Sequence, residues 1–299
     1  MTPLVNYDNN NACVHWYENI TQLANQQVSD INRHRWNDIV IAHYTKSGST
    51  GWFGVGGGIA ELRKYCELEG WNEGVQKGLE SLGDLPVPKL PSFRRKKIRA
   101  SSGNALDIHR VYSGDLSKAW ESTKREQSLT KMTYRGHVNI IIDLCANCTV
   151  SAEAMFWRGA VGCLFAKSLI QSGRHVRVIA AATADRPLDW GYGRESGYGE
   201  VTIATVIKDW NYPLELNSLF ASTALAGFFR YYYFKSICAL PHSVDSGLGR
   251  STEFKVDHLN YYLDSTTCLI VENIWDKDQA ISRSAQFVRQ IEEGISDEG

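Results

Sequence analysis

The stretch "IIIDLCANCTVS", residues 140–151, decides the fold class of this chain. It completes an apolar run that ends at Asp143, and a long amphipathic helix pattern follows it over 151–173. A buried strand that leads into a helix is typical of α/β proteins with a parallel sheet. We therefore expect Asp143 at the carboxyl end of a strand, where open parallel sheets bind ligands.

Strand and helix patterns keep alternating after this stretch. The expected elements are strands in "HVRVIAAATA" (175–184), "GEVTIATVIKD" (199–209) and "TTCLIVENI" (266–274), a helical pair over 214–240, and a helix over 276–294 capped by Asp276. This alternation favours a mostly parallel sheet flanked by helices over about residues 137–293.

The N-terminal part of the chain, residues 1–82, is expected to form a smaller α+β module. It begins with a polar, Asn-rich stretch and a short amphipathic helix near 17–31. The apolar run "NDIVIAHY" (37–44) predicts a strand, and apolar residues at helical spacing begin at Ile59.

A break in the pattern separates this module from the rest of the chain. Residues 83–104 contain three closely spaced prolines and then a basic run, which predicts a basic, proline-containing linker or an exposed arm. The α/β domain would then occupy residues 105–299. It would begin with a strand and turn at 105–115 and a polar helix or connector at 116–127.

Composition limits the environment of the protein. The 32 Lys and Arg residues nearly balance the 33 Asp and Glu residues, so any attraction to nucleic acid has to come from a local patch. No apolar run reaches the length of a membrane span, and the first residues do not resemble a secretory signal. We therefore expect a cytoplasmic protein whose seven cysteines stay reduced.

Cys145 and Cys148 leave several interpretations open. A Cys-x-x-Cys pair between a strand and a helix is the arrangement of a thiol redox site, but Asp143 would oppose thiolate formation. A structural zinc site would need a second pair of ligands nearby. Asp143 could also simply cap the turn or helix that follows it.

The segment from residue 137 onward resembles the von Willebrand factor A-like domain. That family carries Asp-x-Ser-x-Ser after its first strand, and here Asp143 matches the aspartate while Cys145 and Asn147 stand at the serines. The long helix, the turn "QSGRHV", the strand "RVIAAA" and the final "LIVENIWDKDQAISRSAQFVRQI" follow in the family's order. The resemblance covers about residues 137–293 and implies partner docking at the carboxyl-end loops.

The resemblance also implies a metal site, which departs here from the family's pattern. Divalent cations such as Mg²⁺ prefer oxygen ligands, and a thiol at position 145 replaces a hydroxyl. Thr183, Asp185 and Asp245 are the candidates for the remaining ligands. We expect a degenerate site at Asp143, with Mg²⁺ as the only cofactor to consider.

The basic run "FRRKKIR" (93–99) is the strongest charge feature. Its candidate nucleic-acid-binding residues are Phe93, Arg94, Arg95, Lys96, Lys97 and Arg99. Clustered Lys and Arg beside an aromatic ring suit a phosphate backbone, and single-stranded nucleic acid in particular. The alternatives are a grip on an acidic protein surface and a solvated linker.

The run "GWNEG" (70–74), the preceding Trp-rich loop and "RRKK" resemble uncharacterised proteins of tailed bacteriophages. No nucleophile elbow, zinc-protease helix or phosphate-binding glycine motif is present in the sequence. We therefore expect a non-enzymatic adaptor that binds single-stranded nucleic acid or recruits phage replication or transcription machinery. The alternative is a metal-dependent A-like module that partners an ATPase.

Overall fold

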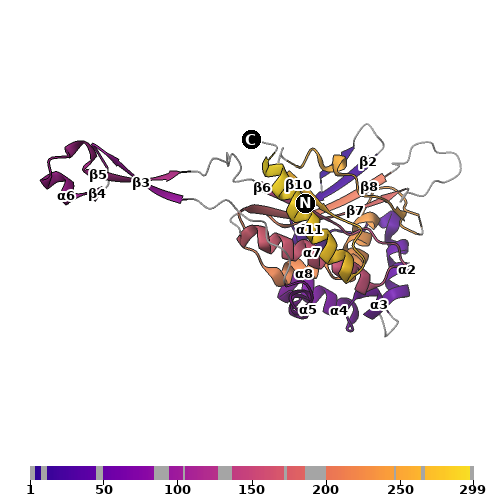
Figure 1. The fold of residues 1–299 in the computed structure, drawn as a ribbon. Coiled ribbons are helices and arrows are strands. Elements are labelled where there is room, and N and C mark those ends of the chain that lie inside the picture. Colours follow the sequence, from indigo (N-terminus) through magenta and orange to yellow (C-terminus); the bar gives the residue numbers. More distant parts are fainter. Residues whose placement is uncertain are drawn as a thin grey trace. The chain divides into compact units, whose positions relative to one another are not determined.

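The computed structural model describes most of the chain in ten segments. They are residues 4–7, 12–44, 50–83, 94–103, 105–126, 137–171, 174–185, 200–245, 247–263 and 267–296. The chain divides into two compact units, each described by itself below (Figure 1). The large unit comprises residues 1–87 and 136–288, and the small unit comprises 88–135 and 289–299.

A seven-stranded mixed sheet forms the centre of the large unit. Its strands are β1 (Leu4–Tyr7), β2 (Ala12–Tyr17), β6 (His137–Asp143), β7 (His175–Asp185), β8 (Glu200–Lys208), β9 (Arg250–Ser251) and β10 (Thr267–Val271). They run in the order β1-β2-β8-β7-β6-β10, and β9 pairs with the end of β7. The expected α/β class is confirmed, and the neighbours β7, β6 and β10 are parallel as predicted.

Strand β8 reverses the direction of the sheet. It pairs antiparallel with β7, and residues 186–199 connect the two strands. A parallel partner would have required a crossover connection such as a helix. On its other edge β8 pairs in parallel with β2, and β1 completes the sheet antiparallel to β2.

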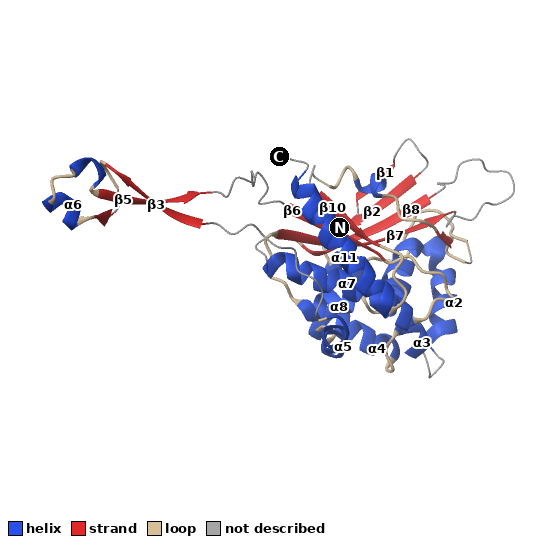
Figure 2. Ribbon diagram, viewed as in Figure 1, coloured by secondary structure: helices blue, strands red, loops and turns tan. Residues whose placement is uncertain are grey.

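Helices cover one face of this sheet (Figure 2). Counting both faces, the helices of the large unit are α1 (Ile20–Ala24), η1 (Asp30–Asn32), α2 (Arg33–Tyr44), α3 (Thr50–Phe53), α4 (Gly58–Lys64), η2 (Tyr65–Glu69), α5 (Asn72–Leu82), α7 (Ala152–Gln171), α8 (Leu216–Thr223), α9 (Ala226–Phe228), η4 (Phe229–Tyr233), α10 (Phe234–Cys238), η5 (Val256–Leu259) and α11 (Lys277–Ser296). Gly159 lets α7 approach α8 closely, because a Cβ there would lie 2.3 Å from the Thr223 carbonyl oxygen. The expected cap of α11 is confirmed: the Gln279 amide donates to Asp276 at 2.8 Å.

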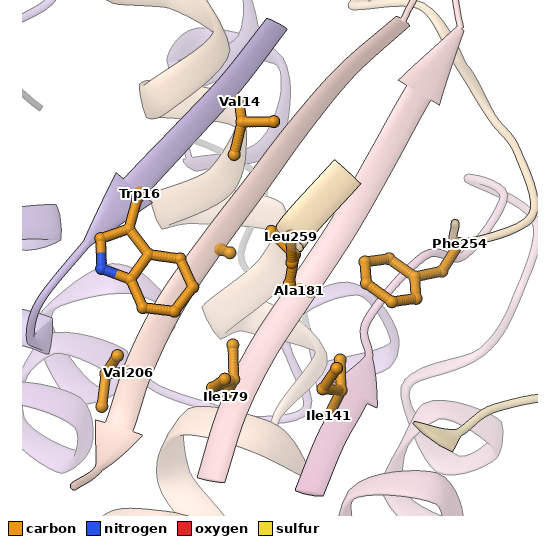
Figure 3. Close-up of a cluster of buried hydrophobic side chains, with 9 residues drawn as sticks. Val14, Trp16, Ile141, Ile179, Ala181, Val206, Phe254 and Leu259 are labelled. Carbon is orange, nitrogen blue, oxygen red and sulfur yellow. The ribbon is translucent and has the colours of Figure 1, made fainter. Parts of the chain in front are cut away.

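The opposite face of the sheet is covered by η5 and the residues around it. Side chains of β2, β6, β7 and β8 meet Phe254 and Leu259 there in a buried apolar cluster (Figure 3). Trp16 extends the cluster by stacking on Tyr262, with 4.5 Å between ring centroids. Because both faces are covered, β6 is apolar along most of its length, which explains why the sequence revealed it so clearly.

The small unit contains a three-stranded antiparallel sheet. Its strands are β3 (Arg94–Ala100), β4 (Ala105–Leu106) and β5 (Trp120–Glu126), in the order β3-β5-β4. Helix α6 (Ile108–Tyr112) and the 3₁₀ turn η3 (Leu116–Lys118) connect β4 to β5.

Several elements differ from the sequence-based expectations. Residues 37–44 lie in helix α2, so the predicted strand is wrong; a short apolar run does not distinguish the two by periodicity. The polar helix or connector predicted over 116–127 is also wrong, because residues 120–126 form strand β5. The basic run lies in strand β3 rather than in an irregular linker, and pairing with β5 is the interaction that decides its structure.

The division into units also differs from the predicted boundaries at 82/83 and 104/105. The N-terminal residues belong to the large unit, because β2 extends the central sheet and α5 packs on α7. Residues 88–135 of the small unit are inserted in the sequence between α5 and β6 of the large unit, and they include part of the segment assigned to the linker.

Candidate functional site

The turn after β6 holds Asp143 in a buried ion pair. One carboxylate oxygen accepts a hydrogen bond from the Cys145 amide at 2.8 Å, and the other lies 3.5 Å from Nη1 of Arg158. Arg158 on α7 is only 1% exposed, and its Nη2 donates to the Cys145 carbonyl at 3.0 Å. Burial raises the pKa of Asp143, and the positive charge of Arg158 opposes that rise. The pair therefore fixes the loop and neutralises its own charge.

Cys145 fastens the end of β6 to β7. Its sulfur lies 2.9 Å from the Thr183 amide nitrogen, which donates to it, and 3.1 Å from the Thr183 carbonyl oxygen. Burial raises the pKa of the Cys145 thiol well above its usual range, whereas a reactive cysteine requires a lowered pKa. Cys145 is a free buried thiol and Cys148 a free exposed one. This environment does not favour the redox interpretation.

The donor set around Asp143 is a poor fit for Mg²⁺. Both carboxylate oxygens are engaged, a cationic guanidinium lies beside them, and the next candidate ligand is a thiol rather than an oxygen. Within the described segments, no group of three His, Cys, Asp or Glu side chains is placed to hold a metal ion. Mg²⁺ binding at Asp143 stays a prediction that these contacts do not support.

Two cavities open at this edge of the sheet. One, of about 510 Å³, is lined by Asp143, Cys145, Asn147 and by residues that the sequence did not indicate, Glu253, Glu272 and Trp275 among them. The other, of about 440 Å³, is lined by the ends of β7 and β8 and by the aromatic residues Phe229, Tyr233 and Phe234. A hydrogen bond of 3.0 Å from the Ser251 hydroxyl to the Ala146 carbonyl lies between them.

The first cavity has an acidic lining. Burial, Asp143 and Glu253 all raise the pKa of Glu272. The guanidinium of Arg158 lies over the Trp275 ring, with 4.7 Å to its centroid. An arginine within the otherwise apolar pattern of α7 was the signal in the sequence for a buried partner of Asp143.

The predicted loop residues are only partly brought together. Asp143, Cys145, Asn147 and Thr183 all lie at the two cavities. Asp185 ends β7 opposite Arg250 of β9, and Asp245 is exposed; neither lines these two cavities. The position of Asp143 at the carboxyl end of a strand is confirmed, and the role of the predicted loop residues stays a prediction.

The basic run forms one strand of a two-stranded basic ribbon, defined here as β3 and β5. The cross-strand partners are Arg94↔Glu126, Arg95↔Arg125, Lys96↔Lys124, Lys97↔Thr123, Ile98↔Ser122, Arg99↔Glu121 and Ala100↔Trp120. Two of these pairs set like charges directly opposite one another, an arrangement that destabilises a sheet. The Nε of Arg99 lies 3.7 Å from a Glu121 carboxylate oxygen. Phe93 lies outside the described residues.

The excess of positive charge extends over the whole segment 88–135 and is not limited to residues 93–99. Residues 88–135 contain 12 Lys and Arg residues and 4 Asp and Glu residues, a formal net charge of +8, whereas the whole chain carries −1. Lys124 and Arg125 were missed in the sequence because they lie about thirty positions from the run they pair with. Counting charge by segment would have indicated them.

Alternation along the strands puts basic residues on both faces of the ribbon. Directly opposed residues share a face, so Arg95, Lys97 and Arg125 lie on one side. Lys96 and Lys124 lie on the other side together with Arg94.

Comparisons with known proteins leave the site without a functional precedent. Neither the curated proteins nor the solved structures contain a match to this chain. In the segments described, no helix has the length and apolar character needed to cross a membrane. The model of one family, "Domain of unknown function (DUF7192)", matches residues 5–295, so this chain belongs to the DUF7192 family.

Proposed function

We propose that this protein is a nucleic-acid-binding adaptor whose basic ribbon contacts the phosphate backbone. The observation that carries the proposal is the pairing of Arg95 with Arg125 and of Lys96 with Lys124. Each like-charged pair costs the isolated sheet free energy, on the order of 0.2–1 kcal/mol. A bound polyanion removes that repulsion, so the arrangement supports a role in which phosphates lie against the ribbon.

The shape of the element supports the same ligand. Two-stranded β-ribbons fit nucleic-acid grooves, and their register spaces side chains regularly along a backbone. The net charge of +8 on residues 88–135 gives a local attraction that the chain as a whole lacks. Binding of this kind releases counterions, so affinity should fall steeply with salt.

The large unit is the adaptor part of this proposal. The cavity beside the end of β6 offers a protein partner the carboxylates of Glu253 and Glu272, which suit a basic side chain. Together with the resemblance to tailed-phage proteins, this supports a role in the host cytoplasm, where the protein would bring phage replication or transcription machinery to nucleic acid. No catalytic step is part of the proposal.

The test is an electrophoretic shift with single-stranded and duplex DNA over a salt series. The binding variant replaces Arg94, Arg95, Lys96 and Lys97 by Ala. The matched control replaces four exposed basic residues of the large unit by Ala: Arg33, Lys64, Lys277 and Arg283. Both variants lose four positive charges, so a non-specific effect of net charge would appear equally in both.

We expect the ribbon variant to lose most of its affinity and the control to retain it. The slope of log affinity against log salt should become shallower by about 0.7 for each single-strand phosphate that the variant no longer neutralises. Equal weakening in both variants, or binding that does not respond to salt, would sink the proposal.

A further inference from the structure

The part of the small unit that connects β3 to β5 carries an exposed apolar surface, which the charge of the ribbon does not explain. Five large apolar side chains there are exposed, and we call them the apolar tip: Leu106, Ile108, Tyr112, Leu116 and Trp120. Tyr112 is 87% exposed and Leu116 63%. Half of the ten exposed large apolar residues in the described segments thus lie within residues 106–120, although these make up a small part of the chain.

The tip residues are held in neighbouring positions by the local structure. Leu106 of β4 lies directly opposite Trp120 of β5. Ile108 and Tyr112 are four residues apart on α6, which places them on one face of the helix. The Asp107 amide donates to the Ala119 carbonyl at 2.7 Å and joins the start of α6 to the start of β5.

Ion pairs stiffen the turn between α6 and η3. Nη1 of Arg110 lies 2.8 Å from an Asp115 carboxylate oxygen, and its Nε lies 3.6 Å from Asp107. These contacts cross-link residues on either side of Tyr112, in the segment that leads to Trp120. Ordering of the segment that carries the two rings lowers the entropy lost when they pack against a ligand.

We propose that the apolar tip packs against unpaired bases, with Trp120 and Tyr112 stacking on them, so that the small unit prefers single-stranded nucleic acid. This inference rests on the proposed function of the ribbon. Basic grooves combined with aromatic platforms are the means by which single strands are bound without sequence preference. In a duplex the base faces are already stacked on one another, so the rings would have no partner there.

The position of the tip along the ribbon supports this occupant. The like-charged pairs lie near the end of the ladder formed by Arg94↔Glu126. The pair at the other end, Ala100↔Trp120, includes a residue of the apolar tip. Three residue steps separate the Lys97↔Thr123 pair from it, a distance of about 10 Å along the strand. One short oligonucleotide can therefore contact the cations with its phosphates and the tip with its bases.

An exposed apolar surface is also typical of a protein interface. Nucleic acid is favoured here because the surface continues directly from a segment of net charge +8 and from two like-charged pairs. A protein partner at the tip is one of the outcomes that the experiment distinguishes.

The experiment measures binding of the full-length protein to three probes at one salt concentration: a single-stranded oligonucleotide, the matching duplex, and a single strand of abasic residues. The variants are Tyr112→Ala with Trp120→Ala, and the conservative pair Tyr112→Phe with Trp120→Phe. Circular dichroism and thermal unfolding check that both variants fold. The abasic strand has phosphates but nothing to stack on, so it reports the ribbon alone.

We expect the Ala pair to bind the single strand at least tenfold more weakly while its affinity for the duplex and the abasic strand stays unchanged. The Phe pair should retain most of the single-strand affinity. Unchanged single-strand binding by the Ala pair would overturn the inference and leave the tip to a protein partner. Equal loss on all three probes would overturn it as well, because the tip would then only support the ribbon. Failure of the unmodified protein to bind any probe in a salt-dependent way would reject the proposed function itself.

Discussion

Charged residues have opposite kinds of neighbours at the end of strand β6 in the large unit and in the basic ribbon of the small unit. At the end of β6, the carboxylate of Asp143 has a buried guanidinium beside it and accepts an amide hydrogen bond as well. In the ribbon, Arg95 lies opposite Arg125 and Lys96 lies opposite Lys124. The charge of Asp143 is compensated within the chain, whereas the register of the ribbon places like-charged residues opposite one another. Stability accounts for the buried pair, and the proposed ligand would account for the opposed cations.

Breaking the buried pair should have the largest effect. Asp143→Ala leaves the Arg158 guanidinium buried without its carboxylate, and we expect a loss of about 3–5 kcal/mol in the free energy of unfolding, measured with urea. The double variant Asp143→Ala, Arg158→Met removes both charges and should recover a large part of that loss. If the double variant is no more stable than the single one, the pair does not act by mutual neutralisation.

Charging a buried group of the large unit should have the next largest effect. His15 is 2% exposed, neither ring nitrogen has a hydrogen-bond partner among the described residues, and burial lowers its pKa from 6.5 to about 4. Between these values the unfolded chain binds more protons than the folded one, so stability is lost as pH falls through this window. The loss should reach about 3 kcal/mol near pH 4.

Urea unfolding between pH 7 and pH 4 measures this dependence, with His15→Leu as the comparison. The Leu variant has no group to titrate at this position, so its stability should vary less over the window. An unchanged pH dependence in His15→Leu would show that other groups cause it.

Reversing a charge in the ribbon should have the smallest effect on stability. Unlike the two changes above, it should increase stability. Arg95→Glu and Lys96→Glu each convert a like-charged pair into an opposite-charged one, so the β3–β5 pairing should gain about 0.2–1 kcal/mol per substitution. Hydrogen exchange of the β3 and β5 amides measures the gain, and salt-dependent DNA binding should fall at the same time. Lys97→Glu is the matched control, because Lys97 lies opposite Thr123 and is not part of a directly opposed like-charged pair. It should weaken binding with a smaller gain in stability, and a gain of equal size there would contradict the proposed role of the opposed pairs.

The parts of the fold that the sequence predicted are those with long, uniform patterns. The strands β6, β7, β8 and β10 and the helices α7 and α11 lie where the apolar runs and the Asp276 cap indicated. Burial on both faces produces such runs, and a helix of 20 residues repeats its pattern several times.

The remaining parts depend on contacts between distant residues. Strand β5 has the sequence "WESTKRE", whose charges do not suggest a strand; the partner β3 makes it one. Likewise, Arg158 becomes part of the Asp143 site only because α7 packs beside the end of β6. The residue types at the site were predictable, but their partners required the three-dimensional arrangement.

The pairing of β2 with β8 has a consequence for how the protein is made. Cys13 is the partner of Val201, so the N-terminal strand cannot take its place in the sheet until nearly 190 later residues have left the ribosome. At 5–20 residues per second, this is a wait of roughly ten seconds or more. The small unit closes through pairs such as Ala100 with Trp120, only twenty positions apart, and it can form during that interval. During synthesis, the basic ribbon would then be assembled before the sheet that adjoins it in the sequence is complete.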